Sequence, residues 1–121
     1  WSNCLFVALG GGLGAVGRYL LSLIAAPWSF PVMTLLTNFL GAVVIGAVAQ
    51  AAGQLPMSKS AVLFLKTGLC GGFTTFSTFS LETVELLEQG RWAAGGGYIL
   101  ASVGLCLAGV LLGRALVWKI L

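Results

Sequence analysis

Four stretches of the chain are long enough and apolar enough to cross a membrane as helices. They run over about residues 3–24, 32–52, 58–88 and 92–116. A helix that rises 1.5 Å per residue needs about 20 mostly apolar residues to span the hydrocarbon core of a bilayer. Only 7% of the residues are charged, whereas a soluble domain has about 25%. We therefore predict an all-α integral membrane protein, a single domain over residues 1–121 with four transmembrane helices.

Turn and capping residues separate the four stretches. The first stretch is expected to end at a turn over residues 27–31, which holds two prolines and an interfacial tryptophan. Ser58 is predicted to cap the third helix, and Gly90 lies where that helix is expected to end. Similar apolar stretches follow the first one, so we interpret it as a membrane span and not as a cleaved signal peptide. The bases are spread over both ends of the spans, which favours cytoplasmic termini only weakly and is compatible with insertion in both orientations.

The few ionisable side chains exclude several functions. The sequence has no histidine and no aspartate, and its three carboxylates are Glu82, Glu85 and Glu88. No nucleophile has an evident base, so we predict that the protein is not an enzyme. The net charge of +3 comes from dispersed bases, so nucleic acid is not an expected partner. The three cysteines are far apart in the sequence and are interpreted as small apolar helix residues.

Glycine is frequent within the predicted spans. The chain has 18 glycines, and small residues in membrane helices let two backbones approach closely. We expect packing faces at Gly10, Gly11, Gly12, Gly14 and Gly17 in the first span, at Gly41 and Gly46 in the second, and at Gly104, Gly109 and Gly113 in the fourth.

The third stretch has an unusual middle, with the sequence GGFTTFSTFS at residues 71–80. Two glycines followed by β-branched and hydroxyl side chains form a poor helix, so we predict that the third helix is broken at the glycines, near the membrane midplane. Broken backbone at that depth is tolerated where it is buried in protein or lines a wet cavity. The carbonyl groups that a break frees are suited to holding a small cation. A kink that serves only helix packing is the alternative.

The segment after this break would have two different faces. Helix is expected to resume at Thr74, and its period then separates aromatic rings from hydroxyl groups. One face would carry Phe76, Phe79 and Thr83, and the opposite face Thr74, Thr78 and Glu85. Aromatic ring edges carry partial positive charge and can meet an anion, while packing in a core or against lipid is the alternative. The second face would be a track of hydroxyls that leads to an acid, unless these hydroxyls bond only to their own or neighbouring helices.

Polar side chains in the other spans are further candidates. Asn38 lies in the middle of the second span, where its amide can offer two donors to an anion or can bond to a neighbouring helix. Arg18, near the end of the first span, can draw anions into a vestibule or can extend to the lipid headgroups. Tyr98, Ser102 and Cys106 recur every four residues and form a weakly polar stripe on the fourth span.

Taken together, these residues resemble the CrcB or Fluc family of bacterial fluoride channels, and the resemblance covers nearly the whole chain. It rests on the glycine-rich first span that leads into Arg18-Tyr19, on Thr34-Leu35 with Asn38 and Gly41, and above all on GGFTTFSTFS. The resemblance implies a passive, fluoride-selective channel that exports fluoride across the bacterial inner membrane as a multi-pass protein. It also implies a dual-topology homodimer, with antiparallel subunits in the lipid and two pores along their interface.

The same resemblance implies roles for individual residues. Phe76 and Phe79 correspond to an aromatic box that meets fluoride with its ring edges, and Asn38 corresponds to the pore amide beside it. The backbone carbonyls of Gly71 and Thr74, with their symmetry mates, correspond to the site of a structural sodium ion. Further polar pore-lining positions are Ser77, Thr78, Tyr98 and Ser102, and Cys106 stands where a hydroxyl is expected.

A fluoride pore of this kind is chemically reasonable. Fluoride is small and strongly hydrated, so a pore must replace its water with amide donors, hydroxyls and ring edges. A fully cationic site would hold the ion too tightly to release it. Two other functions are the alternatives: a small multidrug exporter, which would need an acidic residue that the first span lacks, and a structural subunit of a larger membrane complex.

Overall fold

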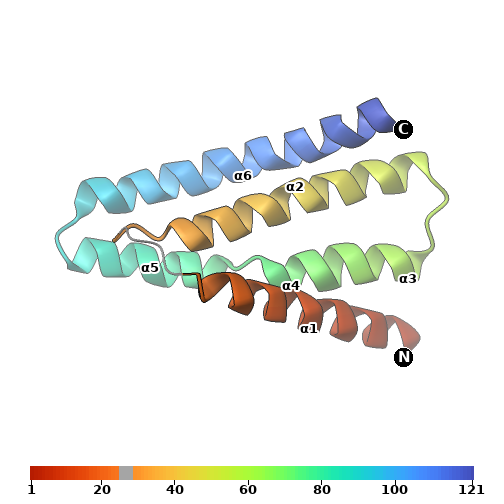
Figure 1. The fold of residues 1–121 in the computed structure, drawn as a ribbon, viewed down its shortest axis with the longest axis horizontal. Helices are drawn as coiled ribbons and strands as arrows, with labels where there is room; N and C mark the ends of the chain where they lie inside the picture. The colour runs from red at the N-terminus through yellow and green to blue at the C-terminus, as the bar shows by residue number, and fades with distance from the viewer. Residues whose placement is uncertain (25–28) are drawn as a thin grey trace.

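The structure, a computed structural model, describes residues 1–24 and 29–121 and is all helical over these residues. Four rods lie side by side, each antiparallel to the next along the chain (Figure 1). The elements are α1 (Ser2–Ser22), α2 (Val32–Gln54), α3 (Lys59–Val62), the π-helical η1 (Leu63–Cys70), α4 (Gly71–Phe73), α5 (Phe76–Glu88) and α6 (Trp92–Ile120). Three of them, α1, α2 and α6, are each long and apolar enough to cross a membrane. The third rod is made of the segments from α3 to α5.

The helices begin and end close to most of the predicted boundaries. The hydroxyl oxygen of Ser58 accepts a hydrogen bond from the backbone N–H of Ala61 at 3.1 Å and so caps α3. Gly90 ends the third rod with a φ of +74°, a conformation that favours glycine. The last helix reaches Ile120, beyond the predicted end at residue 116, because no glycine or proline interrupts the final turns. Of the predicted turn over residues 27–31, the first two residues lie outside the described part of the chain.

The break in the third rod lies at Thr74 and Thr75, so the predicted position at the two glycines is wrong. Gly71 and Gly72 are helical, whereas Thr74 has φ −87° and ψ 155° and Thr75 has φ −148° and ψ 116°. The β-branched threonine side chain suits this extended backbone. A Cβ on Gly72 would collide with the backbone of Gly11. The glycines therefore serve close packing, and the threonines form the break.

Helix resumes at Phe76 and not at Thr74, which changes one of the predicted faces. Thr74 is not in α5, so it does not share a helical face with Thr78 and Glu85, and the predicted hydroxyl track is wrong in this respect. The aromatic face is confirmed, because the ring centroids of Phe76 and Phe79 lie 5.4 Å apart.

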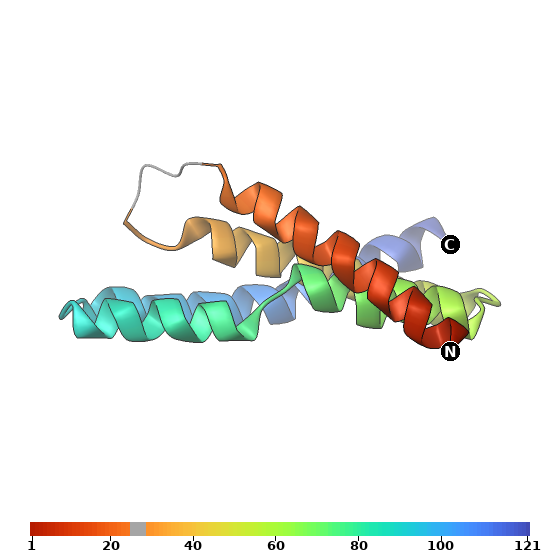
Figure 2. The ribbon, with the colours of Figure 1, turned by 90° about the horizontal axis from the view of Figure 1, so that it is seen from below.

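The rods pack through glycine in two main contacts. α2 packs against α6, and α1 packs against η1 and α4, crossing the segmented rod obliquely (Figure 2). A Cβ on Gly14 would meet the carbonyl oxygen of Leu69, and one on Gly113 would meet the carbonyl oxygen of Val43. Most of the predicted glycine contacts are thus confirmed, but Gly12 and Gly104 have no neighbour within 4 Å of the position of a Cβ.

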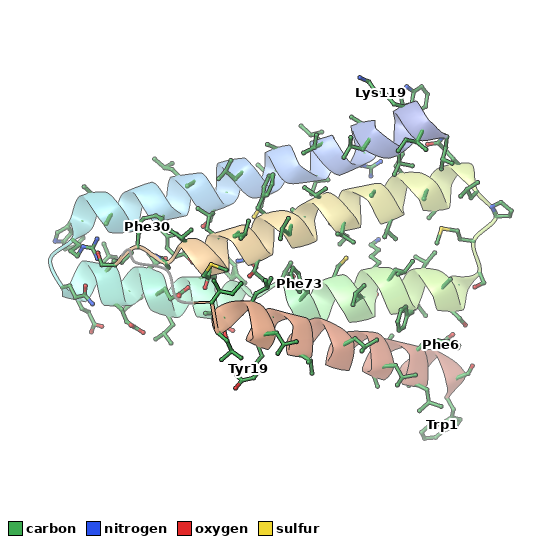
Figure 3. All side chains as sticks on the ribbon, in the orientation of Figure 1. Trp1, Phe6, Tyr19, Phe30, Phe73 and Lys119 are labelled. Carbon is green, nitrogen blue, oxygen red and sulfur yellow. The ribbon has the colours of Figure 1, made fainter. Side chains whose placement is uncertain are left out.

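Large apolar side chains cover the outside of the bundle. On α6, Leu100, Leu107 and Leu111 are 76%, 63% and 68% exposed. Figure 3 shows side chains that project outward from every rod, with Trp1 and Tyr19 pointing away from the neighbouring helices. Such a surface suits lipid, in which apolar side chains need no cover. The two termini and the loop between α2 and α3 lie at one end of the bundle, as an even number of spans requires (Figure 1).

Two glycines of α6 provide a matched test of the close contacts. We expect Gly113→Ala to destabilise the protein by about 1–3 kcal/mol, because its new Cβ has only backbone of α2 to displace. Gly104→Ala should be neutral or slightly stabilising, because alanine is the better helix former and the space there is open. Thermal unfolding in detergent measures both, and equal melting temperatures for the two variants would contradict the packing described for α2 and α6.

Candidate functional site

The break between α4 and α5 is held by the side chain of Asn38. The amide oxygen of Asn38 accepts a hydrogen bond from the backbone N–H of Thr75 at 2.8 Å, and its Nδ2 donates to the carbonyl oxygen of Thr75 at 3.2 Å. Both backbone groups of one extended residue are thereby satisfied, at a depth where an unpaired one is costly. The side-chain amide of Asn38 was predicted to offer two N–H donors. One of them bonds to the carbonyl oxygen of Thr75, and the other remains for another acceptor.

The carbonyl groups before the break fall into two kinds. The Nε of Arg18 donates to the carbonyl oxygen of Gly72 at 3.2 Å, so this carbonyl already has a partner. The carbonyl oxygens of Gly71 and Thr74 accept no hydrogen bond within the part of the chain that the structure describes. The backbone N–H groups that would have paired with them in a continuous helix bond instead to Asn38 and to the Thr75 hydroxyl.

Thr75 begins α5 with its own side chain. Its hydroxyl oxygen accepts a hydrogen bond from the backbone N–H of Thr78 at 3.1 Å and therefore caps the helix. The same hydroxyl donates to the Thr78 hydroxyl at 3.1 Å and lies 3.3 Å from that of Ser77. The predicted pore residues Ser77 and Thr78 are thus brought together around a residue that was not among the predicted ones.

Three aromatic rings form a row beside the break. Phe76 is 76% exposed, and its ring lies 5.4 Å from that of Phe79, whose ring in turn lies 5.1 Å from that of Tyr98. Tyr98 is fully buried, and its hydroxyl donates to a carboxylate oxygen of Glu82 at 3.0 Å. The predicted aromatic pair is therefore next to a hydrogen bond between buried Tyr98 and half-buried Glu82, which sequence reasoning missed because the partners are 16 residues apart and on different helices.

Phe73 fills the space between α1 and α2 at the level of the break (Figure 3). Its ring atoms lie 3.6 Å from a Cβ built on Gly17 and 3.4 Å from one built on Gly41. A Cβ on Gly17 would make only ordinary contact with this ring, whereas a Cβ on Gly41 would also collide with the methyl group of Thr74. Gly41, which the sequence indicated only as a packing residue, therefore helps to position the break.

Two hollows lie on either side of the break. The larger, which we call the groove, has a volume of about 580 Å³ and runs between α2, η1, α5 and α6. Its lining includes Asn38, Gly71, Thr74, Thr75, Phe76, Phe79, Ser102, Cys106 and Lys66. The smaller, which we call the chamber, has a volume of about 140 Å³ and is lined by Arg18, Tyr19, Ser22, Met33, Thr34, Thr37, Thr75 and Thr78. Thr75 lines both.

The groove contains an unsatisfied hydroxyl group. Ser102 is 7% exposed, and its Oγ has no hydrogen-bond partner among the described residues. A buried hydroxyl without a partner is costly in an apolar setting unless a ligand or water completes it. The groove can therefore offer an incoming anion one amide hydrogen from Asn38, a hydroxyl from Ser102 and the ring edges of Phe76 and Phe79.

The predicted site residues separate into groups in the structure. Asn38, Phe76, Phe79, Ser102, Gly71 and Thr74 meet in the groove, whereas Arg18 and Thr78 line the chamber. Ser77 is exposed and contacts Thr75, and Tyr98 lies behind Phe79 in neither lining. The described residues contain no group of three or more His, Cys, Asp or Glu side chains that could hold a metal ion.

Comparison with known proteins identifies similar sequences over nearly the whole chain. Residues 5–114 match the sequence model of a family described as "CrcB-like protein, Camphor Resistance (CrcB)". The chain is similar to a protein of Ruminiclostridium cellulolyticum named "Fluoride-specific ion channel FluC", with 45% identity over 94% of this chain and 91% of that protein. Proteins with the same name from Roseiflexus sp. and Shewanella frigidimarina are 48% and 47% identical, and the matches cover 92% and 98% of this chain and 93% and 98% of those proteins.

The asparagine clamp leads to a prediction for stability. We expect Asn38→Ala to lower the free energy of unfolding by about 1–3 kcal/mol, because the N–H and C=O groups of Thr75 lose their partners at membrane depth. The other asparagine, Asn3, bonds to Ser60 near the end of its helix. Asn3→Ala should cost less, since water can replace the amide there. Denaturation in detergent compares the two, and an Asn38→Ala protein as stable as wild type would contradict the clamp.

Proposed function

The chain belongs to the CrcB family, and from this premise we propose that it is a fluoride-selective ion channel of the bacterial inner membrane. It is a multi-pass membrane protein, and its task is to let fluoride leave the cell passively and so relieve fluoride toxicity. The observation that carries this proposal is the groove beside the break, where neutral donors and ring edges converge without a carboxylate in the lining. Its family is one of channels and not of enzymes. The drug-exporter and structural-subunit alternatives are set aside, because the similar proteins are named as fluoride-specific channels.

The groove can replace the water around a fluoride ion. The remaining amide hydrogen of Asn38 and the unpartnered hydroxyl of Ser102 are donors, and Phe76 and Phe79, whose ring edges carry partial positive charge, are part of the same lining. Each of these is weaker than a full cation. An ion can therefore enter and also leave, as conduction requires.

A second copy of the chain is the proposed cover of the groove. Phe76 is 76% exposed although it lies in the family motif, and the groove is open along one side of the chain. In an antiparallel homodimer the groove of each subunit would become a closed pore, and the surrounding lipid would be excluded from it. The weak asymmetry of the basic residues is compatible with insertion of the two subunits in opposite orientations.

A structural sodium ion is proposed at the centre of this dimer. The carbonyl oxygens of Gly71 and Thr74 accept no hydrogen bond within the described residues, so they are free to coordinate a cation. One subunit offers two such oxygens, and its symmetry mate would double them. The ion would fix the two breaks against each other and takes no part in transport.

Ion efflux from liposomes tests the proposed function. Liposomes with the purified protein are loaded with potassium fluoride or potassium chloride, and valinomycin is added to carry the countercharge. We expect rapid loss of fluoride and negligible loss of chloride, because only the smaller ion fits among these donors. No loss of either ion from correctly folded protein would refute a channel.

The same assay tests the aromatic rings. Phe76→Ile and Phe79→Ile are expected to reduce fluoride efflux by about tenfold or more, because an aliphatic side chain offers no positive edge to the ion. Phe6→Ile is the matched control, since Phe6 lies on the outside of α1. Full efflux from both of the first two variants would remove the rings from the path.

Removal of sodium tests the cation site separately. When sodium is replaced by N-methylglucamine at equal ionic strength, we expect the melting temperature of the dimer to fall by several degrees and to recover when sodium is returned, since four carbonyl dipoles would be left facing one another. Thermal unfolding followed by size-exclusion chromatography measures this. Identical curves with and without sodium would contradict the site and leave the channel function untouched.

A further inference from the structure

Lys66 has an unusual position for a charged residue of a membrane protein. It lies on η1, seven residues after the start of α3 at Lys59 and eight before the break at Thr74. At a rise of about 1.5 Å per residue, it is about 10 Å from the first of these points and about 12 Å from the second along the rod. A charged side chain at such depth is costly in lipid and is expected to face a wet cavity. Lys66 does so, because it lines the groove.

The charge of Lys66 has no neutralising partner among the residues that the structure describes. The three carboxylates, Glu82, Glu85 and Glu88, all lie on α5, on the other side of the break (Figure 1). None of the hydrogen bonds found among residues 1–24 and 29–121 involves its ammonium group. The groove lining contains no acid. The end of the groove at η1 therefore has a positive potential without a compensating carboxylate.

A second feature of this groove suits an anionic ligand. The Oγ of Ser102 is buried, unpartnered and part of the same lining. Cys106, one helical turn further along α6, also lines the groove. A hydroxyl that lacks an acceptor and an ammonium that lacks a counterion have one ligand chemistry in common, which is that of a small anion.

The groove and the chamber together suggest what Lys66 does. Thr75 lines both hollows, so they meet at the break. The chamber has one cation, Arg18, and the groove has one, Lys66. The two cations thus lie on opposite sides of the neutral donors at the break.

We propose that Lys66 attracts anions into the η1 end of the groove and so raises the rate at which fluoride reaches Ser102 and Asn38. This inference rests on the proposed channel function and adds a residue and a role to it. Lys66 acts at a distance, through its charge, and does not take the place of the donors that dehydrate the ion.

Fluoride efflux at two ionic strengths tests the proposal. We expect Lys66→Met to lower the initial efflux rate by about threefold to tenfold at 0.01 M potassium fluoride, where the Debye length is about 30 Å. With potassium gluconate at about 1 M on both sides, where the Debye length is about 3 Å, the difference from wild type should shrink several-fold.

Lys66→Arg should retain the wild-type rate, because it keeps the charge. Lys59→Met is the matched control, since Lys59 is an exposed lysine at the start of the same rod and does not line the groove, and its rate should fall clearly less than that of Lys66→Met.

The outcomes separate this inference from the proposed function. If wild-type protein releases no fluoride, the channel function itself fails. If wild type conducts and Lys66→Met conducts equally well at low ionic strength, only the role of Lys66 fails. The role also fails if Lys66→Met loses rate equally at both ionic strengths and elutes as a dissociated protein, because Lys66 would then be a structural ion-pair partner of a carboxylate on a second copy. Removal of an unpaired charge from membrane depth should not prevent folding, and size-exclusion chromatography of each variant verifies this.

Discussion

The backbone of Thr74 and Thr75 leaves the helix at a depth where no bulk water can satisfy it, and much of the structure serves to meet that requirement. Asn38 from α2 takes both backbone groups of Thr75, Arg18 from α1 takes the carbonyl of Gly72, and the Thr75 side chain starts the next helix. Three elements that are distant in sequence therefore converge on one broken turn. The carbonyls that remain free at this turn are what makes a cation site chemically reasonable there.

Close glycine packing makes this convergence possible. Arg18 can reach Gly72 only because α1 lies almost in backbone contact with the segmented rod, at Gly14 against Leu69 and at Gly11 against Gly72. The side chain of Thr74 fits against α2 because Gly41 has no Cβ to collide with it. Since these contacts leave no room for adjustment, the position of the break is fixed by the packing of its neighbours rather than by its own weak helical propensity.

The sequence predicted the four rods well, because apolar length and turn residues are local signals. It placed the break three residues too early, since glycine was assumed to end the helix when its role was to admit α1. The proximity of Phe76 and Phe79 followed from helical period and is confirmed. The bonds from Asn38 to Thr75 and from Tyr98 to Glu82 join different helices, and no periodicity within one helix indicates such partners. Thr75 was overlooked because its bonds to Asn38 are made by backbone groups, which every residue has, and because its hydroxyl caps a helix that was expected to begin one residue earlier.

The placement of charge follows a consistent physical rule across the site. A full cation beside a dehydrated fluoride would form a deep well and stop conduction, whereas the same cation several ångströms away attracts the ion without replacing its water. Arg18 uses its Nε on a backbone carbonyl, and Lys66 lies about two turns of helix before the break. Between them are an amide, a hydroxyl and ring edges, each of which carries only partial charge. In this arrangement the cations attract fluoride at one place and the neutral donors replace its water at another. The chain has few ionisable residues, and Arg18 and Lys66 can still attract an anion because neither is paired with a carboxylate among the described residues of its own subunit.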